Sequence, residues 1–295
     1  MRGAAPWLRH VEVIANTASG GVQPDAPAEL EKIFSDFEVK ARVCAPPPED
    51  LTRYLQEAVD ARPDLLVVLA GDGTLRAAAE LCGPKGPVIA PLPGGTMNML
   101  PHAVYGRRSW QDALSVALAQ GVEMMLGGGE VEGHVFLCAA ILGSPALWAP
   151  AREAARFRKA RLAWLRARIA LQRTFSSHLR YTLDDGPRDK AVALSFLCPL
   201  ISRALDEKTQ ALEAAILDIQ GARDVVSLGF HAMTGDWREA PAVEATAARG
   251  ARIWAVERIP AIIDGEAVRL TNTAKVAFKP DIVRVLGLPK ALREA

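Results

Sequence analysis

Cysteine is scarce in this sequence, and its spacing argues against the common metal and disulfide frameworks. The chain has only four cysteines in 295 residues, at positions 44, 82, 138 and 198. No Cys-x-x-Cys pair occurs, and the five histidines show no mutual spacing typical of metal ligands. We therefore expect neither a zinc site nor a disulfide scaffold, and the scattered thiols favour a reducing compartment.

Long hydrophobic runs and an excess of one charge are also lacking. No stretch approaches the roughly 20 apolar residues of a membrane-spanning helix, and the N-terminal residues do not have the pattern of a signal peptide. Lys and Arg number 35 against 34 Asp and Glu, so net charge gives no indication of nucleic acid as a partner. Half of the residues are hydrophobic and 23% are charged, which is typical of a globular protein.

Strand and helix patterns alternate over residues 1–126. Short apolar runs predict strands at 11–16, 38–44, 65–70 and 87–92, and helical spacing or helix-start residues predict helices at 27–37, 48–61, 74–82 and 109–121. Such alternation is typical of a parallel sheet covered by helices on both faces. We expect an N-terminal α/β domain over these residues.

Residues 127–280 have a different character. Strand-like segments dominate, at 134–143, 178–186, 191–200, 224–233, 252–270 and 273–280, with helical stretches expected only near 150–175 and 204–215. Turn residues between the strands favour an antiparallel β-sandwich or barrel. The glycine triplet 127–129 is the predicted boundary, and residues 281–295 are expected to return to the first domain.

Three glycine-rich loops follow strands of the predicted parallel sheet. They read NTASGG at 16–21, AGDGT at 70–74 and PGGTMNM at 93–99. Ligands of parallel sheets collect at the carboxyl ends of the strands, and a glycine turn that opens a helix presents backbone N–H groups suited to phosphate. Ser19, Thr74 and Thr96 add hydroxyl donors. Neither a P-loop motif nor a well-placed dinucleotide fingerprint is present, so this phosphate site has another design.

Asp72 is the one acidic residue in these loops. A bare carboxylate would repel phosphates, whereas Mg²⁺ placed between them prefers this combination of ligands. The alternative is an aspartate that hydrogen-bonds its own turn. The loop by itself leaves both interpretations open.

Four motifs in order carry a resemblance to a known family. NTASG, AGDGT, PLPGGTMN (91–98) and IDGE (263–266) resemble those of the diacylglycerol kinase catalytic-domain family, which includes sphingosine, ceramide and bacterial lipid kinases. The resemblance implies a nucleotide-binding domain like that of NAD kinases over 1–126, a β-sandwich lipid-substrate domain over 127–280, and a cleft between them. It also implies a kinase that uses ATP and Mg²⁺ to phosphorylate the hydroxyl of a diacylglycerol-like or ceramide- or sphingoid-like lipid.

The same resemblance implies roles for individual residues. Glu266 occupies the position of the proton acceptor with Asp264 beside it, while Asp72 competes as the base and is the residue expected to act through Mg²⁺. The implied nucleotide-binding residues are Asn16, Thr17, Ser19, Gly20, Gly71, Asp72, Gly73, Thr74, Leu75, Gly95, Thr96 and Asn98.

Four positions depart from the family pattern. Ala77 and Met99 stand where acids are usual, and Ala214 with Ala215 replaces an Asp-Gly pair of a structural Mg²⁺ site, so we do not expect this site here. Two other functions therefore stay open, an NAD kinase-like enzyme and a catalytically weak pseudokinase that binds lipid or nucleotide as a regulator.

Residues 151–175 predict a basic amphipathic helix. The segment holds eight basic residues and one acid, Glu153, with apolar side chains on another face. Such a helix suits an anionic membrane surface, with Arg152, Arg156, Lys159 and Trp164 as the expected contacts, or else packs on the sandwich as a solvated helix. We expect a cytoplasmic protein at the inner face of the membrane, with a lipid and not a nucleic acid as partner. A homodimer is left open.

Overall fold

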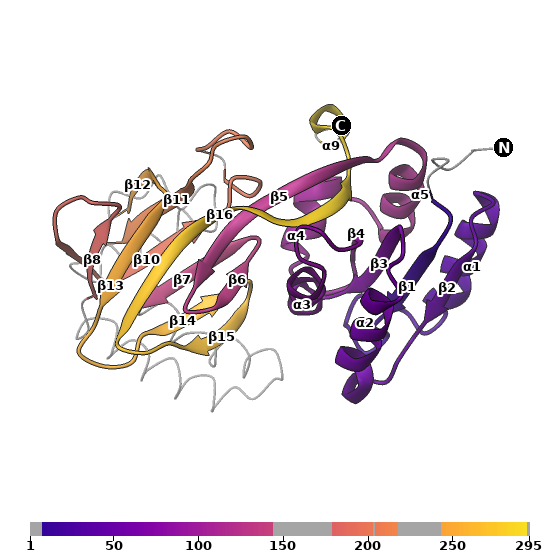
Figure 1. Ribbon diagram of the computed structural model, residues 1–295, viewed down its shortest axis with the longest axis horizontal. Helices are drawn as coiled ribbons and strands as arrows, with labels where there is room; N and C mark the ends of the chain where they lie inside the picture. Colours follow the sequence, from indigo (N-terminus) through magenta and orange to yellow (C-terminus); the bar gives the residue numbers. More distant parts are fainter. Residues whose placement is uncertain (1–7, 144–178, 203, 218–242, 294–295) are drawn as a thin grey trace. The chain divides into compact units, whose positions relative to one another are not determined.

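The computed structural model describes residues 8–143, 179–202, 204–217 and 243–293. The chain divides into two compact units: a first unit of Met1–Gly127 with Pro280–Ala295, and a second unit of Gly128–Lys279. Strands β5 (Val122–Val131) and β16 (Thr273–Gly287) take the chain from one unit to the other and back (Figure 1).

The first unit is built on a parallel sheet with the strand order β2–β1–β3–β4–β16. The strands not yet defined are β1 (Val11–Ala15), β2 (Ala41–Cys44), β3 (Leu65–Ala70) and β4 (Val88–Pro93). Every residue of β1 and β3 is buried. Because both faces of such a strand are buried, its sequence is a nearly continuous apolar run. The predicted α/β fold is confirmed.

Helices pack against this sheet through buried apolar residues, except for the short C-terminal helix, which has no buried residue. They are α1 (Ala26–Asp36), α2 (Leu51–Asp60, preceded by the 3-10 turn Pro48–Asp50), α3 (Asp72–Cys82), α4 (Met99–Tyr105), α5 (Trp110–Gln120) and α9 (Lys290–Arg293). In α1 the buried residues are Ala26, Leu30 and Phe34, spaced one turn apart. The hydroxyl of Ser109 caps α5 by accepting the N–H of Asp112 at 3.1 Å.

Two features near this sheet were not predicted from the sequence. Helix α4 forms although it contains Pro101, because proline in the first turn removes no intrahelical hydrogen bond. The glycine triplet 127–129 lies inside β5 and not in a loop. Gly129 is explained by packing, since a Cβ there would lie 2.0 Å from Cζ of Phe136.

The second unit is an antiparallel sandwich, as predicted. One sheet has the order β16–β13–β8–β9, with β5 paired to β16 and β6, and the other has the order β12–β11–β10–β7–β14–β15. Their bounds are β6 (His134–Phe136), β7 (Ala139–Gly143), β8 (Leu179–Leu183), β9 (Asp189–Ala191), β10 (Ala193–Leu197), β11 (Leu212–Leu217), β12 (Val243–Ala248), β13 (Gly250–Trp254), β14 (Pro260–Ile263) and β15 (Glu266–Arg269). Side chains of both sheets, including Phe136, Phe196 and Ile253, form one core cluster.

The prediction of a helix near 204–215 is wrong. Residues Leu212–Leu217 form β11, which is buried along its whole length and pairs with β10 and β12. Leu, Glu and Ala favour a helix intrinsically, but pairing on both sides outweighs that preference. The segments expected at 150–175 and 224–233, with Arg152, Arg156, Lys159 and Trp164, lie outside the described residues. Among the helices described, none has the length and apolar character needed to cross a bilayer.

Candidate active site

Three loops meet at the carboxyl edge of the parallel sheet. We call residues 16–22, 70–74 and 93–98 the first, second and third loops. They follow β1, β3 and β4, which are neighbours, with Ala15 in register with Leu69 and Leu69 in register with Leu92. The N–H of Asn16 donates to the carbonyl of Leu69 at 2.9 Å, which fixes the start of the first loop against the adjacent strand. The loops thus lie side by side, as the parallel order requires.

Glycines let the three backbones touch. A Cβ on Gly95 would lie 2.7 Å from Cα of Gly71, and one on Gly94 would lie 2.8 Å from the backbone N of Ala70. The N–H of Gly21 donates to the carbonyl of Gly94 at 3.0 Å, and the N–H of Gly94 donates to the carbonyl of Ala70 at 3.0 Å. Side chains at these positions would push the loops apart. Gly71 differs, because its Cβ would meet only ordinary contacts at 3.7 Å or more.

The second loop opens α3, with Gly71 as its capping residue. The first N–H groups of a helix have no intrahelical acceptor, and the helix dipole places partial positive charge there. At this position α3 presents Asp72 and Gly73, while the N–H of Thr74 is bonded to the carbonyl of Gly71 at 3.0 Å. An anion such as a phosphate group is the natural ligand of this arrangement.

Asp72 lies half-buried at this helix start. Its Oδ1 accepts the backbone N–H of Leu100 at 3.3 Å, which links the second loop to the first turn of α4. Within the described residues, Oδ2 has no hydrogen-bond partner. The carboxylate therefore combines both interpretations of the sequence: one oxygen makes a local backbone bond and the other remains available to a ligand.

The other predicted nucleotide-binding residues divide into exposed and internal ones. Exposed on the loops are Thr17, Gly20 and Thr96, while Asn16, Ser19, Gly73 and Thr74 are partly exposed. Ser19 Oγ lies 4.0 Å from the position of a Cβ on Gly71, so its hydroxyl borders the open space above the second loop. These residues can donate hydrogen bonds to a phosphate on the rim.

Asn98 and Leu75 support the conformation of the loops through hydrogen bonds and burial. The side chain of Asn98 accepts the N–H of Gly95 at 2.7 Å and donates to the carbonyl of Gly95 at 3.1 Å, while its own backbone is left-handed with φ +50°. Leu75 is 1% exposed, and its N–H bonds the carbonyl of Gly71. Both residues shape the site, and their own polar groups are already used there.

The polar groups of the three loops suit ATP together with a Mg²⁺ ion that is bound through a single protein carboxylate. Backbone N–H groups and hydroxyls suit phosphates, and Mg²⁺ bound mainly through phosphate oxygens and water needs only one or two carboxylates. Asp72 supplies one free oxygen of that kind. Across the described ranges, no group of three or more His, Cys, Asp or Glu side chains forms a cage of protein ligands for a metal ion.

The remaining predicted residues lie in the second unit, in the hairpin between β14 and β15. Asp264 and Gly265 form its two-residue turn, with φ values of +45° and +87°, and Ile263 pairs with Glu266 across it. Positive φ at both positions is the reason for an Asp-Gly sequence in such a turn. Glu266 is an exposed residue at the start of β15.

The carboxylate of Asp264 is hydrogen-bonded to backbone N–H groups. Its carboxylate accepts the N–H groups of Leu137, Cys138 and Ala139 at 2.7, 2.9 and 2.9 Å, and the residue is only 6% exposed. It thereby fastens the hairpin to the segment before β7. Burial, together with the negative charge of Asp264, raises the pKa of the nearby Cys198 thiol. We assign Asp264 to positioning the turn that carries Glu266.

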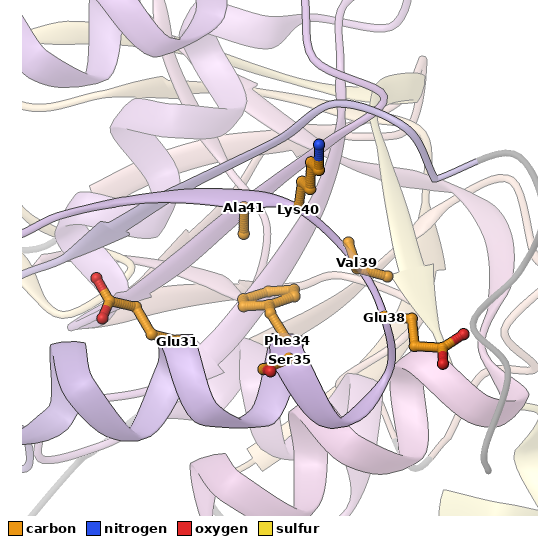
Figure 2. A pocket seen from close by; sticks show the side chains of 7 residues that line it. All are labelled: Glu31, Phe34, Ser35, Glu38, Val39, Lys40 and Ala41. Atoms are coloured by element: carbon orange, nitrogen blue, oxygen red, sulfur yellow. The ribbon is translucent and has the colours of Figure 1, made fainter.

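A separate groove in the first unit lies away from these loops. It encloses about 430 Å³ beside the end of α1 and the start of β2, with Glu31 and Glu38 at its two ends and the Phe34 ring between them (Figure 2). The start of a parallel strand is opposite the carboxyl edge at which the three loops meet. This groove is therefore not part of the candidate active site.

Sequence reasoning missed Gly21, Gly94 and Leu100. Their contributions are backbone contacts between loops, and only the doubled glycines at 20–21 and 94–95 hinted at them. Leu100 gave no signal, because it contributes its N–H alone.

Comparisons with known proteins agree with this architecture. The family model of the diacylglycerol kinase catalytic domain matches residues 10–127. A diacylglycerol kinase structure from Bacillus anthracis str. Sterne is similar over 96% of this chain and 97% of its own, with 16% sequence identity and a TM-score of 0.66. An NAD kinase from Archaeoglobus fulgidus, solved in complex with ATP, is similar over 97% of this chain and 96% of its own, with 13% identity and a TM-score of 0.50.

Identities this low establish a shared fold, and no curated protein matches the chain. Residues 10–127, which include all three glycine loops, match the family model of the diacylglycerol kinase catalytic domain, so this region of the chain resembles that family.

Proposed function

We propose that this protein is a lipid kinase that transfers the γ-phosphate of ATP to the hydroxyl of a diacylglycerol-like or ceramide- or sphingoid-like lipid. One observation carries the proposal: three loops in direct glycine contact surround a helix start whose carboxylate keeps one oxygen free. Phosphoryl transfer depends on positioning and on stabilising charge, and this arrangement offers both.

In this proposal the N–H groups at the start of α3 and the hydroxyls of Ser19, Thr74 and Thr96 hold the phosphates of ATP. Asp72 would hold Mg²⁺, and the ion would supply neutralisation of phosphate charge. Glu266 accepts the proton of the attacking lipid hydroxyl, for which an exposed carboxylate is suited. Asp72 is the competing base.

A second function is favoured by the departures from the family pattern. Met99 opens α4 and Ala77 lies within α3, so two positions near the second and third loops lack the acids usual in the family. A pseudokinase that binds nucleotide or lipid as a regulator would need neither acid. Turnover separates this function from the kinase.

The proposed acceptor is membrane-embedded, so the protein is expected to act as a peripheral protein at the inner face of the membrane. The predicted basic helix at 151–175, with Arg152, Arg156, Lys159 and Trp164, remains a proposal for that contact. Replacing Arg152, Arg156 and Lys159 with glutamate is expected to weaken binding to anionic vesicles.

The test is transfer from γ-labelled ATP to diacylglycerol, ceramide, sphingosine, phosphatidylglycerol and NAD, each with and without Mg²⁺. We expect label on one lipid, and a loss of about 100-fold or more in turnover for Asp72→Asn and for Glu266→Gln. Label on NAD would support an NAD kinase-like enzyme, and no label on any acceptor would support the regulator. Full activity in both variants would refute the assignment of these residues.

A further inference from the structure

One face of a sheet in the second unit gathers basic side chains. Strands β8, β13 and β16 run side by side in Figure 1, and their residues alternate between the core and the exterior. The core positions are Leu179, Tyr181, Ala251, Ile253, Ala274 and Val276. The opposite face presents the exposed residues Arg180, Lys190, Arg252 and Lys275. With Arg188 and Trp254, we call these residues the basic face.

Strand register places like charges opposite one another. Arg180 is the registered partner of Lys190 on β9, and Arg252 is the registered partner of Lys275 on β16. Within the described part of the chain, none of these cations makes an ion pair. Like charges directly opposite in a sheet destabilise the pairing, so the fold gains nothing from this arrangement. An anionic partner outside the chain would compensate for the repulsion.

Acidic residues near the basic face lie at its margin and are used locally. Asp184, in the turn after β8, accepts the N–H groups of Arg249 and Gly250 at 2.9 and 2.8 Å. Asp189, on edge strand β9, accepts the N–H of Lys190 at 2.8 Å. Glu132, in the turn between β5 and β6, accepts the backbone N–H of Lys275 at 3.2 Å, and further along β16 the side chain of Lys279 pairs with Glu130 at 3.1 Å. The side chains of Arg180, Lys190, Arg252 and Lys275 themselves have no ion pair among the described residues.

Aromatic and apolar groups lie among the charges. Trp254 is the registered partner of Arg180, and its half-buried ring has the Arg188 guanidinium 5.4 Å from its centroid. Two residues further on, Val256 is 97% exposed. Tryptophan is favoured where an apolar environment meets a polar one, and a fully exposed valine gains by leaving water.

We propose that the basic face docks on the surface of an anionic lipid bilayer. Cations spread over a flat sheet match a plane of negative headgroups, to which each adds attraction, while Trp254 and Val256 enter the interfacial layer. Nucleic acid would use the cations but not the exposed valine. This inference rests on the proposed lipid kinase, because a peripheral enzyme must reach an acceptor held in the membrane.

The test measures co-sedimentation of the full chain with phosphatidylcholine vesicles, with and without one third phosphatidylglycerol. The variant carries Arg180→Gln, Arg252→Gln and Lys275→Gln. Each basic residue near an anionic surface contributes about fivefold in affinity, so about 100-fold weaker binding to anionic vesicles is expected. A matched control carries Lys32→Gln, Lys85→Gln and Arg107→Gln, three exposed cations of the first unit, and should change binding by less than about twofold.

Unchanged binding by the basic-face variant, or an equal loss in the control, would overturn the proposal. So would tight binding of the wild-type chain to a DNA duplex that is lost in the same variant. Phosphorylation of dispersed short-chain diacylglycerol, ceramide or sphingosine, measured without vesicles, separates the two proposals. If neither the wild type nor the variant phosphorylates any of these lipids while vesicle binding falls as expected, the kinase proposal fails and the docking surface is supported. If one of them is phosphorylated while vesicle binding is unchanged, the docking surface alone fails.

Discussion

The dipeptide Asp-Gly occurs in both units at predicted functional positions, in contrasting surroundings. Asp72 opens helix α3, is half-buried and accepts one backbone N–H, that of Leu100 at 3.3 Å. Asp264 forms the corner of a hairpin, is 6% exposed and accepts three backbone N–H groups at 2.7 to 2.9 Å. Among the described residues, one oxygen of the first carboxylate has no hydrogen-bond partner, whereas both oxygens of the second accept backbone N–H groups.

This difference teaches how to separate chemistry from architecture within one motif. A carboxylate can act on a metal or a proton only if a lone pair remains available. In the second unit, Asp264 supports the turn and the neighbouring Glu266 is exposed. In the first unit the supporting role belongs to glycines and Asn98, so Asp72 keeps free capacity.

The largest expected effect on stability is that of Asp264→Ala. The substitution leaves the N–H groups of Leu137, Cys138 and Ala139 without an acceptor in a buried place, and each buried unsatisfied donor costs about 1–3 kcal/mol. We expect a loss of about 3–5 kcal/mol in the free energy of unfolding, measured by urea denaturation.

Asp72→Ala is the matched comparison. It removes one longer hydrogen bond at a half-buried helix start, so the expected loss is about 1 kcal/mol or less, with loss of turnover. Equal destabilisation by the two substitutions would contradict the distinction between a ligand-binding and a fold-supporting aspartate.

An effect on stability between those of Asp264→Ala and Asp72→Ala is expected for the glycines that bring the loops together. In Gly95→Ala the new Cβ would lie 2.7 Å from Cα of Gly71, and forced packing of this kind costs about 1–3 kcal/mol. In Gly71→Ala the nearest atoms lie at 3.7 Å and 4.0 Å, so stability should change little. Thermal unfolding of both variants measures the difference.

Gly71→Ala should nevertheless weaken ATP binding by about tenfold or more, because its methyl group would occupy the space above the second loop, where the backbone is expected to approach a phosphate. Isothermal titration with ATP checks this. If Gly71→Ala binds ATP as the wild type does, the nucleotide does not lie over the second loop.

The sequence predicted the fold classes because periodicity determines them. Buried runs such as Leu65–Ala70 predict parallel strands, and the segments after residue 130 predict an antiparallel sandwich. It failed at β11, whose residues favour a helix in isolation, and at α4, which contains a proline. In both places tertiary pairing or position in the first turn outweighs local preference.

The loop positions of the candidate site were also readable, because glycine next to hydroxyl or acid is a local pattern. Which residues of the site bind a ligand and which support the fold could not be predicted from the sequence. The bond between Asp72 and Leu100 and those from Leu137, Cys138 and Ala139 to Asp264 join residues 28 to 127 positions apart in sequence, which no local pattern encodes. The basic face likewise arises from register between distant strands and not from a run of basic residues.

The smallest expected effects concern two buried thiols, Cys82 in the first unit and Cys198 in the second, whose raised pKa values have little influence at neutral pH. Burial alone raises the pKa of Cys82, at the end of α3, to about 12, whereas for Cys198 the charge of Asp264 adds to burial. Both buried thiols are neutral in the folded state near pH 8, so alkylation at that pH should modify partly exposed Cys44 first.

The stability that the neutral Cys82 thiol contributes is complete below the unfolded thiol pKa near 9 and is lost as pH rises toward its folded pKa of about 12. Asp264→Asn removes only the second cause at Cys198, so its pKa should fall part of the way while burial keeps it above the usual value. Alkylation rates measured against pH by mass spectrometry would show this as a shift of Cys198 alone. A matching shift at Cys82 would mean that the substitution loosened the first unit as well, and that Asp264 acts on more than its own hairpin.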